Sequence, residues 1–307
     1  MASASAGDIR PRTRPRELED PLNYYLYHPL AARLARLLVP TGISPNLVSV
    51  GSLVALLFAT WAFVRLPWPD NALAGLGFMM LWHVIDGADG DLARMTGRAS
   101  ATGELVDGVC DYAGNVVMYF AFGFLADDTL GGWAWVLGLS AGASHVVQTN
   151  HSETQRRLYL WRAYGVPWLR TAAAEGDAVF RKEGWFNRLF GFWAEAYIWL
   201  SERMSPAANP IDEALAAADP AEAERIRALV RRSSGPSLLL EKALAGNPKT
   251  LIIAAAIALG SPVYYFLTTL VLLNLILIVS IVQHRAAARH LAAALESSRP
   301  APPANPR

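Results

Sequence analysis

Long apolar stretches alternate with short polar ones over the first half of the chain, and they return near its end. A helix of about 20 apolar residues is long enough to cross a bilayer. The pattern predicts six such helices, at 45–66, 71–94, 103–125, 131–149, 250–259 with its flanking turns, and 263–282. We therefore expect an all-α, polytopic membrane protein.

Polar sequence separates and flanks these helices. Arginines alternate with proline and threonine in residues 1–20, which predicts a disordered basic arm near lipid headgroups. Leucines and tyrosines recur at helical spacing in 21–40, as in an amphipathic helix lying in the membrane interface. The predicted regions are therefore the arm at 1–20, the interfacial helix and first four spans at 21–149, a cytoplasmic or interfacial helical insertion at 150–247, two spans at 248–290 and a proline-rich disordered tail at 291–307.

Composition and charge agree with this picture. The chain has 307 residues, of which 53% are hydrophobic and 17% charged, and its net charge of +1 gives no sign of nucleic-acid binding. Arginines gather in the loops that share a side with both ends of the chain, while the opposite loops hold only Arg65. Because positive charge marks the cytoplasmic side, both termini are expected inside, as in a bacterial inner or plasma membrane protein.

Two pairs of carboxylates interrupt the second and third predicted spans. Asp86 and Asp89 are three residues apart, and Asp107 and Asp111 are four apart, so each pair can share one helix face. A short turn between the spans makes them antiparallel neighbours and brings the pairs together. A carboxylate within a membrane costs about 2.5–3.5 kcal/mol on insertion scales, which divalent cations can offset. Four oxygen ligands without His or Cys favour Mg²⁺, Mn²⁺ or Ca²⁺ over zinc.

Two other interpretations of this stretch are weaker. An EF-hand loop beginning at Asp86 would need a ligand at Ala88, glycine at Asp91 and glutamate at Gly97. A solvated charged loop would not explain why Gly103, Asp107 and Asp111 share one face of an otherwise apolar helix.

The full spacing resembles the signature of the CDP-alcohol phosphotransferase family. The matching positions are Asp86, Asp89, Gly90, Ala93, Arg94, Gly103, Asp107 and Asp111. The resemblance implies that the four aspartates hold two Mg²⁺ or Mn²⁺ ions and that Asp111 is the general base. It also implies that the remaining signature residues line the cytidine-diphosphate pocket. Asn46 and Ser49 match family positions in the donor site. The alternative explanation of this stretch is a helix cap, with Ser44 as the capping residue and Pro45 in the first helical position.

The resemblance also implies a reaction. A hydroxyl attacks the β-phosphorus of a CDP-linked alcohol, CMP leaves and a phosphodiester forms, at an active site on the cytoplasmic membrane face. Family members are commonly homodimers. Arg156 and Arg157 are candidates to bind a phosphorylated acceptor, or they only anchor the fourth span by the positive-inside rule.

The sequence leaves the substrates open. We favour CDP-diacylglycerol with a small polar alcohol, for phospholipid biosynthesis. The alternative is a soluble CDP-alcohol of the choline, ethanolamine or inositol type that donates its head group to a lipid hydroxyl. A metal transporter is a remote alternative, because it would place acids across the membrane depth and these acids gather at one end.

Overall fold

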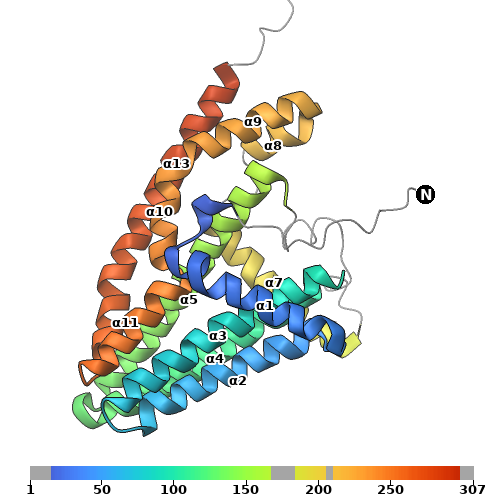
Figure 1. The fold of residues 1–307 in the computed structure, drawn as a ribbon. Coiled ribbons are helices and arrows are strands. Elements are labelled where there is room, and N and C mark those ends of the chain that lie inside the picture. The colour runs from blue at the N-terminus through green and yellow to red at the C-terminus, as the bar shows by residue number, and fades with distance from the viewer. Residues whose placement is uncertain (1–14, 167–183, 205–209, 298–307) are drawn as a thin grey trace, which may run out of the picture.

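The computed structural model describes residues 15–166, 184–204 and 210–297, and every element in these ranges is a helix, with no strand among them (Figure 1). The predicted all-α class is therefore confirmed. Residues 1–14 of the predicted arm and 298–307 of the predicted tail lie outside the described residues.

In chain order the elements are η1 (Arg16–Leu18), η2 (Asn23–Tyr27), α1 (His28–Leu38), η3 (Val39–Thr41), α2 (Pro45–Arg65), α3 (Asp70–Met95), α4 (Ala101–Leu130), α5 (Trp133–Tyr164), α7 (Gly184–Met204), α8 (Pro210–Ala217), α9 (Pro220–Ser233), α10 (Gly235–Leu244), α11 (Gly246–Ala258), α12 (Val263–Thr268), η4 (Thr269–Leu273) and α13 (Asn274–Ser297).

Local capping signals fix where α2 and α4 begin. The Ser44 hydroxyl accepts a hydrogen bond from the Leu47 amide at 3.3 Å, and Pro45 occupies the first turn of α2. Ser100 caps α4 in the same way, by accepting from the Gly103 amide at 3.1 Å. Both caps satisfy amides that a helix start leaves without partners.

α2 packs against both α3 and α4, and glycines let these helices approach closely. A Cβ added at Gly75 of α3 would lie 2.2 Å from the Phe63 ring, and one added at Gly114 of α4 would lie 2.4 Å from Leu56 Cδ2. Small residues at helix crossings are typical of packing inside membranes, where close van der Waals contact replaces the hydrophobic effect. The same core continues to α5, α11 and α12 through side chains such as Phe266.

Three described helices are long and apolar enough to cross a membrane, at Pro45–Arg65, Ala101–Leu130 and Val263–Leu295. The last joins α12, η4 and α13 into one continuous helix. α11 has only 13 residues, and the second halves of α3 and α5 carry many polar side chains. Three apolar helices indicate a membrane protein, while the six-span count stays a prediction.

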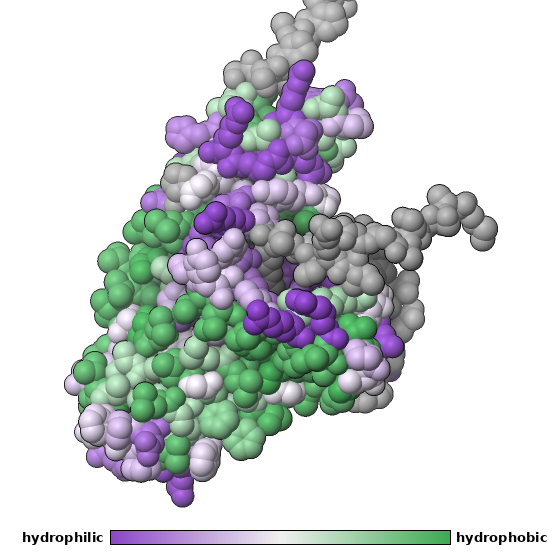
Figure 2. All heavy atoms as spheres, viewed as in Figure 1, coloured by the Kyte–Doolittle hydropathy of each residue, from purple (hydrophilic) through white to green (hydrophobic). Residues whose placement is uncertain are grey.

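The surface also has an apolar part and a polar part. Figure 2 shows hydrophobic residues over the lower half of this face, across α2, α3 and the lower parts of α11 and α13, with hydrophilic residues over α8 and α9. α1 lies across α3 and buries Ala31 and Ala35. Tyr25 of the preceding η2 and Leu37 of α1 are more than 70% exposed. This leaves an apolar stripe free to lie in the membrane interface.

The predicted insertion is helical where it is described, but it has no break at residue 150. α5 continues to Tyr164, and its second half packs with α8, α9, α10 and the end of α13. Residues 16–18, which we assigned to the disordered arm, form a 3-10 turn instead. The hydroxyls of Tyr159 and Tyr164 both donate to Glu17 Oε1, at 2.7 and 2.5 Å, and attach this turn to α5. At the other end α13 continues to Ser297, into the predicted tail, and the remaining region boundaries stay predictions.

Candidate active site

The acid pairs lie on neighbouring antiparallel helices, Asp86 and Asp89 on α3 and Asp107 and Asp111 on α4. Asp86, Asp89 and Asp107 each offer a carboxylate oxygen, and these oxygens lie within 4.8 Å of one another. The helical spacing and the short turn between α3 and α4 produce this convergence. α3 is one continuous helix through this stretch, which rules out an EF-hand loop at Asp86.

Ser49 of α2 joins the cluster from a third helix. Its hydroxyl donates to Asp89 Oδ2 at 2.5 Å, and both residues are buried, with exposed fractions of 2% and 5%. We expected Ser49 to line a donor pocket, and in the structure its hydroxyl orients one of the carboxylates.

Asp111 lies one turn beyond Asp107 and outside the group of three. The Trp82 indole Nε1 donates to Asp111 Oδ1 at 3.2 Å. Asp107 and Asp89 both act electrostatically on Asp111, so the fourth acid belongs to the same charged cluster. Trp82 is a site residue that we did not predict, although its position one turn before Asp86 on the same helix face is a signal that could have found it.

The residues fit a hard divalent cation. Three carboxylates this close repel one another, and Asp107 Oδ1 is buried without a hydrogen-bond partner among the described residues. A buried carboxylate oxygen without a partner is costly unless a cation binds it. An all-oxygen donor set matches Mg²⁺ or Mn²⁺, whose identity the side chains alone do not distinguish.

The other signature residues surround the cluster. A Cβ at Gly103 would lie 3.6 Å from Asn46 Oδ1, so Asn46 of α2 lies beside the start of α4. A Cβ at Gly90 would lie 3.3 Å from Arg94 Nη1, next to half-buried Ala93. The small residues thus leave backbone accessible beside the acids.

Arg94 is paired within its own helix. Its Nη2 donates to Asp91 Oδ1 at 2.5 Å, and its side chain is 42% exposed. An incoming phosphate would compete with Asp91 for this guanidinium.

Residues 42–169 match the family model described as CDP-alcohol phosphatidyltransferase. Residues 42–169 therefore correspond to a CDP-alcohol phosphatidyltransferase domain. A search of curated proteins finds no match for the chain. The domain contains all four aspartates, and its family is a transferase family that implies phosphotransfer from a CDP-alcohol to an acceptor.

Arg156 and Arg157 lie at the polar end of the CDP-alcohol phosphatidyltransferase domain, and both are engaged by carboxylates. Both donate to Glu153, Arg156 through Nε at 2.8 Å and Arg157 through Nε at 2.5 Å. Arg157 also reaches Glu104 of α4 at 3.0 Å, one turn before Asp107. Burial alone would raise the pKa of Glu153, but the two arginines lower it below its usual value.

α7, which belongs to the predicted insertion, packs against the domain. We did not predict this contact. Ala194 and Tyr197 of α7 pack against Leu105 and Ala101 at the start of α4. Their side chains lie far from the signature in sequence, and no local pattern indicated this contact.

Proposed function

We propose that the protein transfers a substituted phosphate group from a CDP-alcohol to an acceptor hydroxyl and releases CMP, in phospholipid biosynthesis. The observation that carries this proposal is the convergence of Asp86, Asp89 and Asp107 from two helices, with Asp111 one turn away. Asp86, Asp89, Asp107 and Asp111 would hold two Mg²⁺ or Mn²⁺ ions. Bound there, the ions would neutralise the charge of the diphosphate and align it for in-line displacement.

The chain's own residues have separate roles in this reaction. Asp111 accepts the proton of the attacking hydroxyl as the new oxygen–phosphorus bond forms and the bond to the CMP oxygen breaks. Trp82 orients Asp111, and Ser49 orients Asp89. Gly90, Ala93, Arg94, Gly103 and Asn46 supply the pocket for the cytidine diphosphate.

The membrane setting is part of the proposal. The protein is an integral membrane protein with its active site on the cytoplasmic face, and it acts as a homodimer. The apolar helices α2 and α4 support a lipid as one of the substrates, because α4 carries Asp107 and Asp111 and Ser49 of α2 contacts Asp89. Arg156 and Arg157 would bind a phosphorylated acceptor only by giving up part of their contacts with Glu153.

CMP release by the purified protein tests the reaction and its donor. We expect release with CDP-diacylglycerol and a small polar alcohol in Mg²⁺ or Mn²⁺. Release only with CDP-choline, CDP-ethanolamine or CDP-inositol and a lipid hydroxyl would reverse donor and acceptor. No release with any of these donors would contradict the proposed function.

The role of Asp111 has its own test. Asp111→Asn cannot accept the proton, so CMP release should stop while Mn²⁺ still binds to the other three carboxylates. Unchanged CMP release by this variant would show that Asp111 is not the base.

A further inference from the structure

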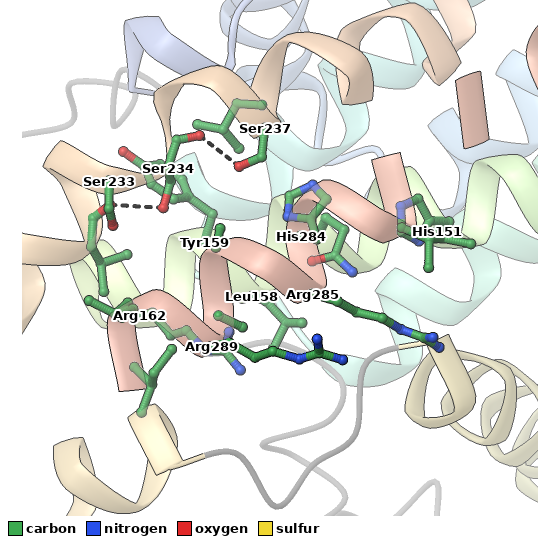
Figure 3. Close-up of a pocket in the computed structure, with 18 residues that line it drawn as sticks. His151, Leu158, Tyr159, Arg162, Ser233, Ser234, Ser237, His284, Arg285 and Arg289 are labelled. Atoms are coloured by element: carbon green, nitrogen blue, oxygen red, sulfur yellow. Dashed lines mark hydrogen bonds between the residues drawn. The ribbon is translucent and has the colours of Figure 1, made fainter. Parts of the chain in front are cut away.

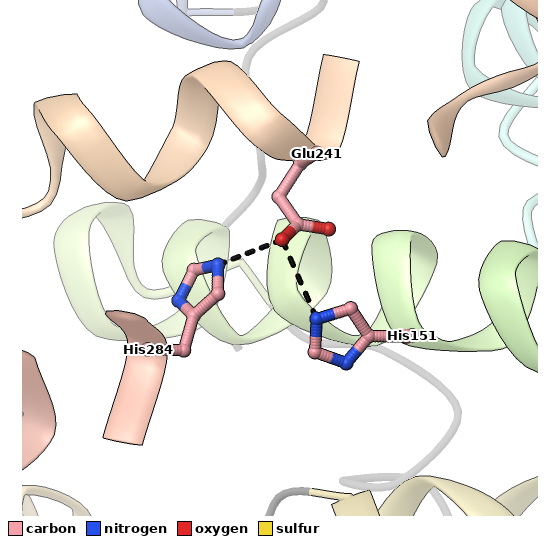
Figure 4. Close-up of side chains that lie close together, drawn as sticks. All are labelled: His151, Glu241 and His284. Atoms are coloured by element: carbon pink, nitrogen blue, oxygen red, sulfur yellow. Dashed lines mark hydrogen bonds and ion pairs between the residues drawn. The ribbon is translucent and has the colours of Figure 1, made fainter. Parts of the chain in front are cut away.

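A second cluster of metal-binding side chains lies outside the aspartate site. His151 of α5, Glu241 of α10 and His284 of α13 each offer one ligand atom, and these atoms lie within 4.8 Å of one another (Figure 4). His151 and Glu241 are buried, with exposed fractions of 0% and 5%. We infer that these three residues form a zinc-type metal site.

The distances suit a small, imidazole-binding cation. Glu241 Oε1 lies 2.8 Å from His284 Nε2 and 3.5 Å from His151 Nε2. Ligands about 2.0–2.1 Å from a tetrahedral Zn²⁺ are about 3.3 Å apart, between these two values. Two imidazoles and one carboxylate favour Zn²⁺ over Mg²⁺, so the site differs in chemistry from the all-oxygen aspartate cluster.

One carboxylate oxygen of this cluster lacks a hydrogen bond, although its neighbours are well connected. Ser280 donates to Glu241 Oε1, and its hydroxyl lies 2.9 Å from His151 Nε2. Glu241 Oε2 remains buried without a hydrogen-bond partner among the described residues. A cation held by Glu241 would also stabilise this buried oxygen, whereas the protein-only arrangement leaves it at a cost.

Neighbouring contacts hold the cluster in place, and two of its residues line a cavity. The Ser152 hydroxyl donates to the backbone carbonyl of Glu241 at 3.1 Å and fixes α10 against α5. His151 and His284 both line a cavity of about 330 Å³ whose walls include Arg285, Arg289 and several serines (Figure 3). Three protein ligands leave a fourth coordination position open, which water or an anion in this cavity would fill.

Metal content measured on the full-length protein tests this inference. The protein is purified without a histidine tag, loaded with Zn²⁺ in excess Mg²⁺ to occupy the aspartate cluster, and dialysed. We expect about one zinc per chain in the wild type and in His290→Ala, an exposed residue of the same helix α13. Glu241→Gln and His284→Ala should bind zinc at least tenfold more weakly. Equal zinc retention in these variants, or none in the wild type, would overturn the inference.

A second measurement needs no substitution. Co²⁺ bound to nitrogen and oxygen ligands in a four-coordinate site gives intense visible absorption, which Zn²⁺ should abolish by displacement. Zinc at 100 times its dissociation constant should also raise the Tm by about 5–10 °C, because the ion joins three helices. Weak, octahedral-type Co²⁺ absorption with no zinc-dependent change in Tm would contradict a four-coordinate metal site at His151, Glu241 and His284. Neither readout depends on CMP release, so this inference and the proposed function can fail separately.

Discussion

Replacing Ser49 by alanine removes the hydroxyl that orients Asp89. The Ser49 hydroxyl donates to Asp89 Oδ2 at 2.5 Å, and water cannot replace it easily because both residues are almost fully buried. A hydrogen bond to a charged group contributes about 1.5–3 kcal/mol. If this energy is lost from the metal-binding state, the metal affinity falls roughly 10- to 150-fold. Substitutions of groups that hydrogen-bond to metal ligands typically have effects of about 10- to 100-fold, in the same range.

The assay is the Mn²⁺ concentration that gives half-maximal CMP release, measured for Ser49→Ala and for Ser52→Ala. Ser52 is also buried and lies on the same helix, but its hydroxyl donates to the Ser49 carbonyl at 2.7 Å rather than to an aspartate. We expect a large shift for Ser49→Ala and less than about a threefold shift for Ser52→Ala. Equal Mn²⁺ dependence in Ser49→Ala and the wild type would show that this contact does not prepare Asp89 for metal binding.

Two further predictions concern α3. Trp82→Phe removes the donor to Asp111, and we expect kcat for CMP release to fall about tenfold; an unchanged kcat would show that this contact does not position Asp111. Gly75→Ala places a Cβ 2.2 Å from the buried ring of Phe63 and should destabilise the protein by about 1–3 kcal/mol in detergent melts. Gly77→Ala, where nothing lies within 4 Å, should leave stability unchanged or raise it by up to about 1 kcal/mol. Similar melts for both alanine variants would show that the helices have room at this crossing.

The sequence predicted α2, α3 and α4 closely because local signals define them. Each contains an apolar run of suitable length, and Ser44 caps α2 as its position suggested. α4 was expected over 103–125, but it begins at Ala101 after the Ser100 cap and continues to Leu130. The aspartate cluster was equally predictable, since intrahelical spacing and one short turn determine which faces meet.

Other features depend on contacts that sequence patterns do not reveal. α5 was expected to end at 149, where its sequence turns polar, but tertiary packing carries it on to Tyr164. Gln148 donates to the Thr269 carbonyl at 3.0 Å, where η4 widens the helix, and this contact holds the polar part of α5 inside the bundle. The cluster of His151, Glu241 and His284 draws on three helices far apart in the chain, so no spacing rule could identify it.

We propose that the aspartates of α3 and α4 form a metal-dependent phosphotransfer site. The most direct test is CMP release from the CDP-alcohol donors as Mn²⁺ is restored after chelation, for the wild type and for Asp107→Asn. We expect CMP release by the wild type to be absent after chelation and to return with Mn²⁺, while Asp107→Asn stays inactive in a folded state. CMP release that persists without divalent metal, or in Asp107→Asn at the wild-type rate, would contradict it.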